Sequence, residues 1–145
     1  MKHRQILLMP TYFTNVPSCI EDETDEEPQI THEALPPFLE GPMHALRLPL
    51  EKAEKRAILD SVRASELYDE ELRMYKVSGN LSGETPELGR ANAFARGWLE
   101  HESIWLHMEY KYLLEELRSG LYSEFCEDFH MAAVPFLDPA GGAAR

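Results

Sequence analysis

The chain has 145 residues, 43% of them hydrophobic, and a formal net charge of −12 at pH 7. The length is enough for one domain with a hydrophobic core, and the acidic balance argues against nucleic acid and anionic membranes as partners, because both are bound through clustered Lys and Arg. No apolar run approaches the roughly 18 residues of a membrane span, and the run at residues 6–9 is too short for a signal peptide. We therefore expect a cytoplasmic protein.

The first 50 residues predict little regular structure. Residues 4–13 predict a short strand that ends near Pro10, because Ile, Tyr and Phe favour a pleated surface and proline interrupts the pairing. The acidic run EDETDEE at residues 21–27 predicts a solvated or disordered loop. Residues 34–50 contain four prolines and are expected to be extended and irregular. We interpret 1–50 as an irregular N-terminal segment with a short strand and an acidic loop.

Residues 51–138 predict a mainly helical segment, and 139–145 a low-complexity tail. The expected elements are an amphipathic helix at 51–64, a short helix at 66–75, a strand within 74–79, a loop at 78–90, a long helix at about 100–119 and a last helix at 121–134. The long helix has no Gly or Pro inside it, and Gly120 stands where a C-terminal cap belongs. The fold class expected from these elements is mainly α.

The long helix has an unusual wheel. At 100° per residue its apolar residues form two stripes instead of one. The wide stripe contains Leu106, Tyr110, Leu113, Leu114, Leu117 and Leu121, and the second contains Trp105, Met108 and Tyr112. A helix with two apolar faces has to pack on two sides, and the other predicted helices are too short to cover both. We expect self-association, a protein partner, or the remaining part of a larger assembly, with the second stripe left exposed.

The candidate chemistry lies in residues 97–122, which hold two Trp, three Tyr, two His and five Glu. His101 and His107 are six residues apart and cannot chelate one metal from a helix, so no metal site is predicted. The acidic side chains could hide a glycosidase-type pair or form an ordinary solvated face, which the charge pattern favours; they are Glu100, Glu102, Glu109, Glu115 and Glu116. Trp98 and Trp105 could stack on sugars or anchor an interface. Cys19 and Cys126 are expected to be free thiols.

The run GWLEHESIWLHMEYKYLLEELRSGLYSEF at residues 97–125 resembles the late catalytic-domain segment of bacterial proteins related to cellobiose phosphorylase, an inverting glycoside phosphorylase. The likeness extends to PTYF at 10–13, FLEGPMHALRL at 38–48, SELYDEELRMYKVSGNL at 65–81, ELGRANAF at 87–94 and VPFLDPA at 134–140. It covers most of this chain but a small part of such a protein.

The resemblance implies an (α/α)6 barrel, in which each helix packs on two sides. It implies that His107 contacts phosphate or sugar, with Trp105 and Glu102 as further substrate- or phosphate-binding candidates. Inorganic phosphate would be the co-substrate and an oligosaccharide the other partner in the full-length relative, with no other cofactor. The remaining barrel segments, or a second copy, would complete the core.

Three departures from the family pattern limit the activity that this resemblance implies. The general acid of the family lies in a motif like DWNDG, and this chain has no such motif, so no catalytic residue is assigned. Residue 101 is His where the family has Asn, and the family chain continues past FLDPA whereas this one ends in GGAAR. We therefore expect an inactive fragment of a carbohydrate-active protein. The alternatives are a small acidic helical interaction module and a stand-alone enzyme that uses Glu and His.

Overall fold

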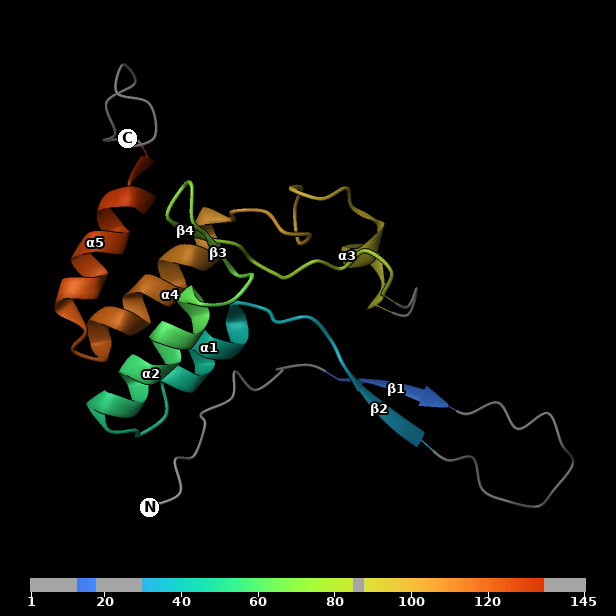
Figure 1. Ribbon diagram of the computed structural model, residues 1–145, viewed down its shortest axis with the longest axis horizontal. Helices are drawn as coiled ribbons and strands as arrows, with labels where there is room; N and C mark the ends of the chain where they lie inside the picture. The colour runs from blue at the N-terminus through green and yellow to red at the C-terminus, as the bar shows by residue number, and fades with distance from the viewer. Residues whose placement is uncertain (1–12, 18–29, 85–87, 135–145) are drawn as a thin grey trace, which may run out of the picture.

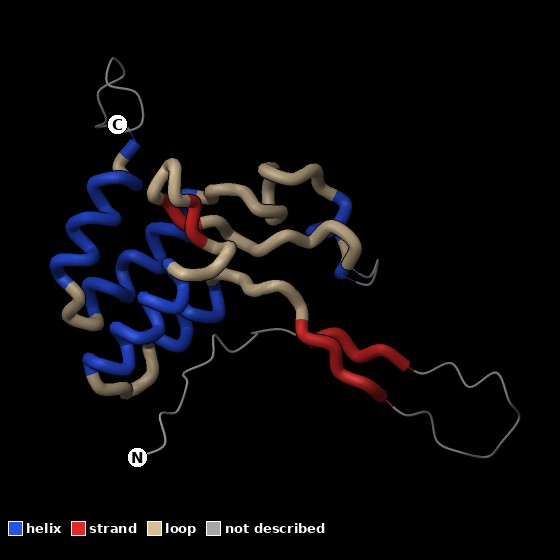
Figure 2. Tube along the Cα trace, in the orientation of Figure 1, coloured by secondary structure: helices blue, strands red, loops and turns tan. Residues whose placement is uncertain are grey.

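Helices α1, α2, α4 and α5 gather at one side of the molecule in the computed structural model, which describes residues 13–17, 30–84 and 88–134 (Figures 1 and 2). The elements in chain order are β1 (Phe13–Pro17), β2 (Ile30–Ala34), α1 (Glu40–Leu46), α2 (Lys52–Arg63), β3 (Tyr68–Asp69), β4 (Met74–Tyr75), α3 (Arg90–Ala93), α4 (Leu106–Arg118) and α5 (Tyr122–Ala132). The described part is mainly helical, as predicted. Within these ranges, no helix combines the length and the apolar character needed to cross a lipid bilayer.

The N-terminal region has more regular structure than the sequence predicts. Strands β1 and β2 pair antiparallel, from Phe13 opposite Ala34 to Pro17 opposite Ile30, and their hairpin extends away from the helices (Figure 1). Most of the strand predicted at 4–13, the acidic run and the C-terminal tail lie outside the described residues.

Helix α1 corrects the prediction that residues 34–50 are irregular throughout. Pro42 is the third residue of this helix. The N–H groups of a first helical turn have no partner within the helix, so a proline there removes no hydrogen bond. Met43 and Leu46 are buried against the other helices. Burial of this apolar pair therefore outweighs the irregularity that the prolines suggest.

Helix α2 confirms the amphipathic helix predicted at 51–64. The backbone N–H of Glu51 donates to Oε2 of Glu54 at 3.0 Å, within a capping box that satisfies the first turn. Ile58, Leu59 and Val62 are buried on one side of the helix. This face packs on α1 and on the rest of the core.

The helix predicted at 66–75 is wrong, because this segment forms the β3–β4 hairpin. Oδ1 of Asp69 accepts the backbone N–H groups of Glu71 and Leu72, at 3.1 and 2.9 Å. Asp offers this local alternative to helical hydrogen bonds. Arg73 then adopts a left-handed φ of 55° and reverses the chain into β4. The strand predicted within 74–79 is confirmed in its first two residues.

Helices α4 and α5 form an antiparallel pair joined by a tight turn (Figure 1). Gly120 ends α4 with a φ of 73°, and the N–H of Leu121 donates back to the carbonyl of Glu116 at 3.1 Å. This is a Schellman ending, for which glycine is the preferred residue. The predicted Gly120 cap and the last predicted helix are both confirmed. The long helix, however, begins at Leu106, and the preceding residues form an irregular segment.

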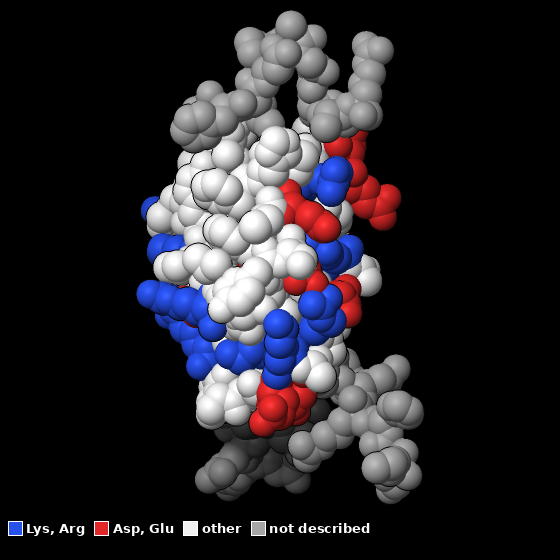
Figure 3. Space-filling model, turned by 90° about the vertical axis from the view of Figure 1, so that its left-hand side faces the viewer, with Lys and Arg blue, Asp and Glu red and all other residues white. Residues whose placement is uncertain are grey.

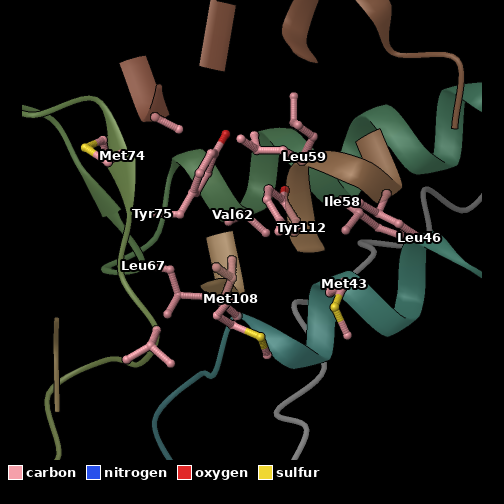
Figure 4. Packing of buried hydrophobic residues seen from close by; sticks show 14 of the residues in the cluster. Met43, Leu46, Ile58, Leu59, Val62, Leu67, Met74, Tyr75, Met108 and Tyr112 are labelled. Carbon is pink, nitrogen blue, oxygen red and sulfur yellow. The ribbon is translucent and has the colours of Figure 1, made fainter. Parts of the chain in front are cut away.

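The core lies between α1, α2, the β3–β4 hairpin and the α4–α5 pair (Figure 4). Its largest fully buried aromatic side chains are Tyr75 and Tyr112, whose ring centroids lie 4.8 Å apart in an edge-to-face arrangement. Met108 and Leu113 of α4 are buried in the same core. Met108 and Tyr112 therefore belong to the covered face of the helix, and the prediction that the stripe formed by Trp105, Met108 and Tyr112 is exposed is wrong for these two residues.

A different stripe of α4 remains partly exposed. Tyr110, Leu114 and Leu117 are 40%, 40% and 37% exposed, and they recur at the spacing of one helix face. On α5, Tyr122 and Phe129 are 63% and 46% exposed. The side of the molecule that α5 occupies shows uncharged residues across its middle and Lys and Arg below them (Figure 3). An uncovered apolar face is therefore present, as expected, but it is formed by these residues and not by the predicted stripe.

Candidate functional site

A hollow of about 500 Å³ opens between the start of α1, the 88–91 segment and the first turns of α4. Its lining residues are Leu35, Phe38, Glu40, Val77, Leu88, Arg90, Ala91, Glu100, Trp105, His107, Met108 and Lys111. We call it the Trp105 pocket. Apolar side chains provide more than half of this lining, and the rest is charged or imidazole. This mixture is the common composition of a small-molecule site.

Two of the three predicted substrate-contact residues line this pocket together. The rings of Trp105 and His107 lie 5.2 Å apart between centroids in an edge-to-face arrangement, and Trp105 is 37% exposed. Lys111 follows His107 by one helical turn and also lines the pocket. An aromatic surface therefore stands beside one cation and one group that can donate to an anion.

Glu100 lines the pocket from the segment that precedes α4. Its Oε1 receives a hydrogen bond from Nη2 of Arg90 at 2.7 Å, within an ion pair whose Arg90 side chain is 79% exposed. Its Oε2 is shielded from solvent and receives no hydrogen bond from the described residues. A shielded carboxylate oxygen without a donor is costly. A donor such as a ligand hydroxyl would satisfy this oxygen.

Glu102, the third predicted contact residue, is not among the residues that line the pocket. Its carboxylate pairs with the guanidinium of Arg96, and Nζ of Lys76 lies 3.5 Å from Oε1. The hydrogen bond from Arg96 is the main reason why the pKa of Glu102 is lowered. Glu102 is thus paired with two cations, and its carboxylate ties residues 96–102 to Lys76, directly after β4.

His101 is buried and serves the backbone. Its Nδ1 lies 2.7 Å from the carbonyl oxygen of Phe94, and its Nε2 accepts the backbone N–H of Leu81 at 3.2 Å. These partners require the tautomer with the proton on Nδ1. Among the described residues, no group of three His, Cys, Asp or Glu side chains is placed to hold a metal ion.

A second polar group lies inside the core and is separate from the pocket. We call it the buried ionic cluster; its members are Arg63 of α2, Tyr75 of β4, Glu109, Tyr112 and Glu116 of α4, and Asp128 of α5. Asp128 accepts the Tyr75 hydroxyl at 2.5 Å and Nη2 of Arg63 at 2.7 Å. Oε1 of Glu109 accepts the backbone N–H of Tyr75 at 2.9 Å. The cluster thereby joins four elements of the core.

The cluster contains three carboxyl groups and one guanidinium, so it cannot be neutral unless protons are retained. Both oxygens of Glu116 and Oε2 of Glu109 receive no hydrogen bond from the described residues. Burial, reinforced by the charge of Asp128, raises the pKa of Glu116 to about 9. Burial also raises the pKa of Glu109 to about 7, against the backbone hydrogen bond from Tyr75. Glu116 is therefore a neutral acid at pH 7.

These positions decide between the two interpretations of the acidic residues. Glu109, Glu115 and Glu116 are 1%, 2% and 0% exposed, so the solvated acidic face is wrong for all three. Glu115 is paired with Arg47 and Arg118. None of the three lines the Trp105 pocket, so they are not placed as an acid–base pair for a sugar bound there.

Arg90 and Lys111 are not predicted as site residues from the sequence, and Glu100 is predicted only as one of five acidic candidates. Glu100 stands among several acidic residues, and composition gives no reason to prefer it to Glu102. Arg90 is brought to the pocket by an irregular segment, whose path a periodic pattern does not predict. Lys111 had a detectable signal, because it lies one helical turn after His107 on the same polar strip.

Comparisons with protein-family models, with curated proteins and with solved structures gave no match for this chain.

Proposed function

We propose that the chain is a carbohydrate-binding segment of a glycoside-phosphorylase-like protein, and that the Trp105 pocket holds the sugar. The observation that carries this proposal is that one hollow is lined both by the partly exposed Trp105 and by Glu100, whose Oε2 receives no hydrogen bond from the described residues. Sugar rings present apolar faces that suit an aromatic side chain, and their hydroxyl groups donate hydrogen bonds to carboxylates. His107 and Lys111 would receive a phosphate group beside the sugar.

The pocket supports binding better than catalysis by this chain alone. Glycoside cleavage by this class of enzyme needs an acid that protonates the leaving oxygen. Glu100 is paired with Arg90, and the carboxyl groups with a strongly raised pKa lie in the buried ionic cluster. The sequence has no DWNDG-like motif. In this proposal, the acid comes from another part of the full-length relative.

The proposed (α/α)6 barrel is supported by α4 and α5. They form an antiparallel pair that packs inward on α1 and α2 and leaves an apolar stripe outward. Helices that are apolar on two faces suit a layered arrangement, in which a further helix covers the outer stripe. The neighbouring barrel helices are the proposed occupants of this stripe.

Sugar binding is tested by titrating the 145-residue chain with cellobiose and with glucose 1-phosphate while Trp fluorescence and heat are recorded. We expect saturable binding, and a Kd about 10-fold higher in Trp105→Ala, because the stacking surface is lost. Trp98→Ala is the matched control, since Trp98 is 61% exposed and lies outside the pocket lining. Equal losses in both variants, or no binding by the wild-type chain, would contradict the proposal.

A second proposed role, as a helical interaction module, rests on the outer stripe of α4. If the stripe mediates self-association in the absence of barrel helices, the weight-average mass should rise with concentration in sedimentation equilibrium. The double variant Leu114→Lys and Leu117→Lys should remain a monomer, because both side chains are partly exposed and their replacement leaves the core intact. A wild-type chain that is monomeric at every concentration would rule out the homo-oligomer.

A further inference from the structure

The segment that carries Glu100 into the pocket has an unusual backbone. Gly97, Leu99 and Glu102 all have positive φ, at 82°, 49° and 52°. Glycine adopts this region freely, whereas residues with a Cβ are strained there. In the described part of the chain, Arg73 is the remaining non-glycine residue with positive φ. Strain of this kind clusters at functional sites, and here it lies on both sides of Glu100. We call residues 97–102 the strained turn.

The Ser78 side chain is hydrogen-bonded to the backbone of this turn. Ser78 is fully buried, and its hydroxyl donates to the carbonyl oxygen of Glu100 at 2.8 Å. Oγ of Ser78 also accepts the backbone N–H of Glu102 at 3.0 Å. One side chain therefore fixes the backbone of Glu100 and that of the strained residue two positions later.

His101 connects the turn to two other backbone segments. It is 3% exposed, and its two ring nitrogens bridge the backbones of Phe94 and Leu81. The N–H of Gly97 also donates to the carbonyl of His101 at 2.8 Å, which closes the turn on itself. The hydrogen bonds of Ser78 and His101 therefore restrict the backbone around Glu100.

The strain is not offset by burial of the turn's own apolar side chains. Trp98 and Leu99 are 61% and 39% exposed. The turn places Glu100 in the wall of the Trp105 pocket, where its Oε2 receives no hydrogen bond from the part of the chain that the structure describes. The strained backbone therefore accompanies the placement of the Glu100 carboxylate in the pocket and does not accompany burial of Trp98 or Leu99.

We propose that Ser78 and His101 are positioning residues, which hold the strained turn so that Glu100 is preset to accept a hydrogen bond from a ligand hydroxyl. This inference rests on the proposed sugar site and extends it. A preset acceptor improves affinity, because less conformational freedom remains to be lost when the ligand binds.

The test is Leu99→Gly, with Leu99→Ala as its matched control. Both variants remove the same exposed side chain, but glycine alone relieves the strained φ and frees the turn. We expect the Kd for cellobiose, measured by calorimetric titration, to rise about 10-fold in Leu99→Gly and to stay unchanged in Leu99→Ala. Leu99→Gly should unfold at the same urea concentration as Leu99→Ala or at a higher one, so the loss of affinity would not reflect a loss of folding.

Ser78→Ala tests the tether itself. It removes the donor to Glu100 and the acceptor for Glu102, and we expect a similar rise in the Kd for cellobiose, with folding checked by urea denaturation. The outcomes separate the two proposals. If the wild-type chain binds cellobiose through Trp105 but Leu99→Gly binds equally well, the positioning role is wrong and the sugar site stands. If the wild-type chain does not bind cellobiose, both proposals fail.

Discussion

Replacing Glu116 by Gln is expected to stabilise the protein at neutral pH by on the order of 3 kcal/mol. In the folded chain the pKa of Glu116 is raised to about 9 from an ordinary 4.5, chiefly by burial. Between these two values the folded state keeps the proton and the unfolded state releases it. The free energy of unfolding therefore falls as pH rises through this window. Gln is neutral at every pH, so it removes this penalty.

Urea denaturation at pH 5, 7 and 8.5 measures this effect. The difference between Glu116→Gln and wild type should be small at pH 5 and should grow with pH. Glu109 also makes the free energy of unfolding of the wild-type protein fall with rising pH, over a narrower window, because its pKa is raised to about 7. The exposed Glu70→Gln serves as the control and should show no trend. A stabilisation of equal size at all three pH values would disprove the protonation argument.

Replacing Arg63 by Met is expected to destabilise the fold by about 3–5 kcal/mol, the usual effect of removing one partner from a buried ion pair. Arg63 is the cation of the buried ionic cluster, and it also donates to the Tyr75 hydroxyl at 3.1 Å. Without it, the buried Asp128 carboxylate loses its ion-pair partner and one of its two donors among the described residues, and the Tyr75 hydroxyl is left. Met preserves most of the side-chain volume, so the effect should be electrostatic.

Arg56→Met is the matched control on the same helix. Arg56 pairs with Glu124, but its side chain is 48% exposed, whereas that of Arg63 is 28% exposed. The Glu124 side chain is 10% exposed, but water can replace the half-exposed Arg56 guanidinium, so we expect a loss of about 0–1 kcal/mol. Urea midpoints of the two variants at pH 7 should therefore differ clearly. Equal midpoints would mean that the cluster is solvated enough to tolerate an unpaired Asp128.

The sequence predicts the helices whose apolar spacing agrees with their packing. Helix α2 follows its pattern of Ile58 and Val62, and α4 ends at the Gly120 cap. The helix prediction for residues 66–75 is wrong because Leu67, Met74 and Tyr75 also match a helical spacing. The hydrogen bonds of Asp69 decide in favour of a hairpin, and such local bonds depend on one side chain instead of on a period.

The site is less predictable, because its chemistry depends on which of several similar residues turn inward. Among the glutamates of residues 97–122, Glu100 lines the pocket, Glu102 pairs with cations, and Glu116 enters the core. A charge pattern treats these residues alike and predicts exposure for all of them. Burial of Glu116 depends on Arg63, Tyr75 and Asp128, which are distant in sequence and become neighbours only in the fold.

The separation of the cluster partners also sets an order of folding events. The contacts between α4 and α5 are local, whereas Arg63 and Asp128 are 65 residues apart in the chain. Closing such a long loop is slow compared with forming a helical hairpin. We therefore expect the ion pair to close after the transition state, as α2 docks. In stopped-flow measurements, Arg63→Met would then accelerate unfolding and leave the refolding rate nearly unchanged.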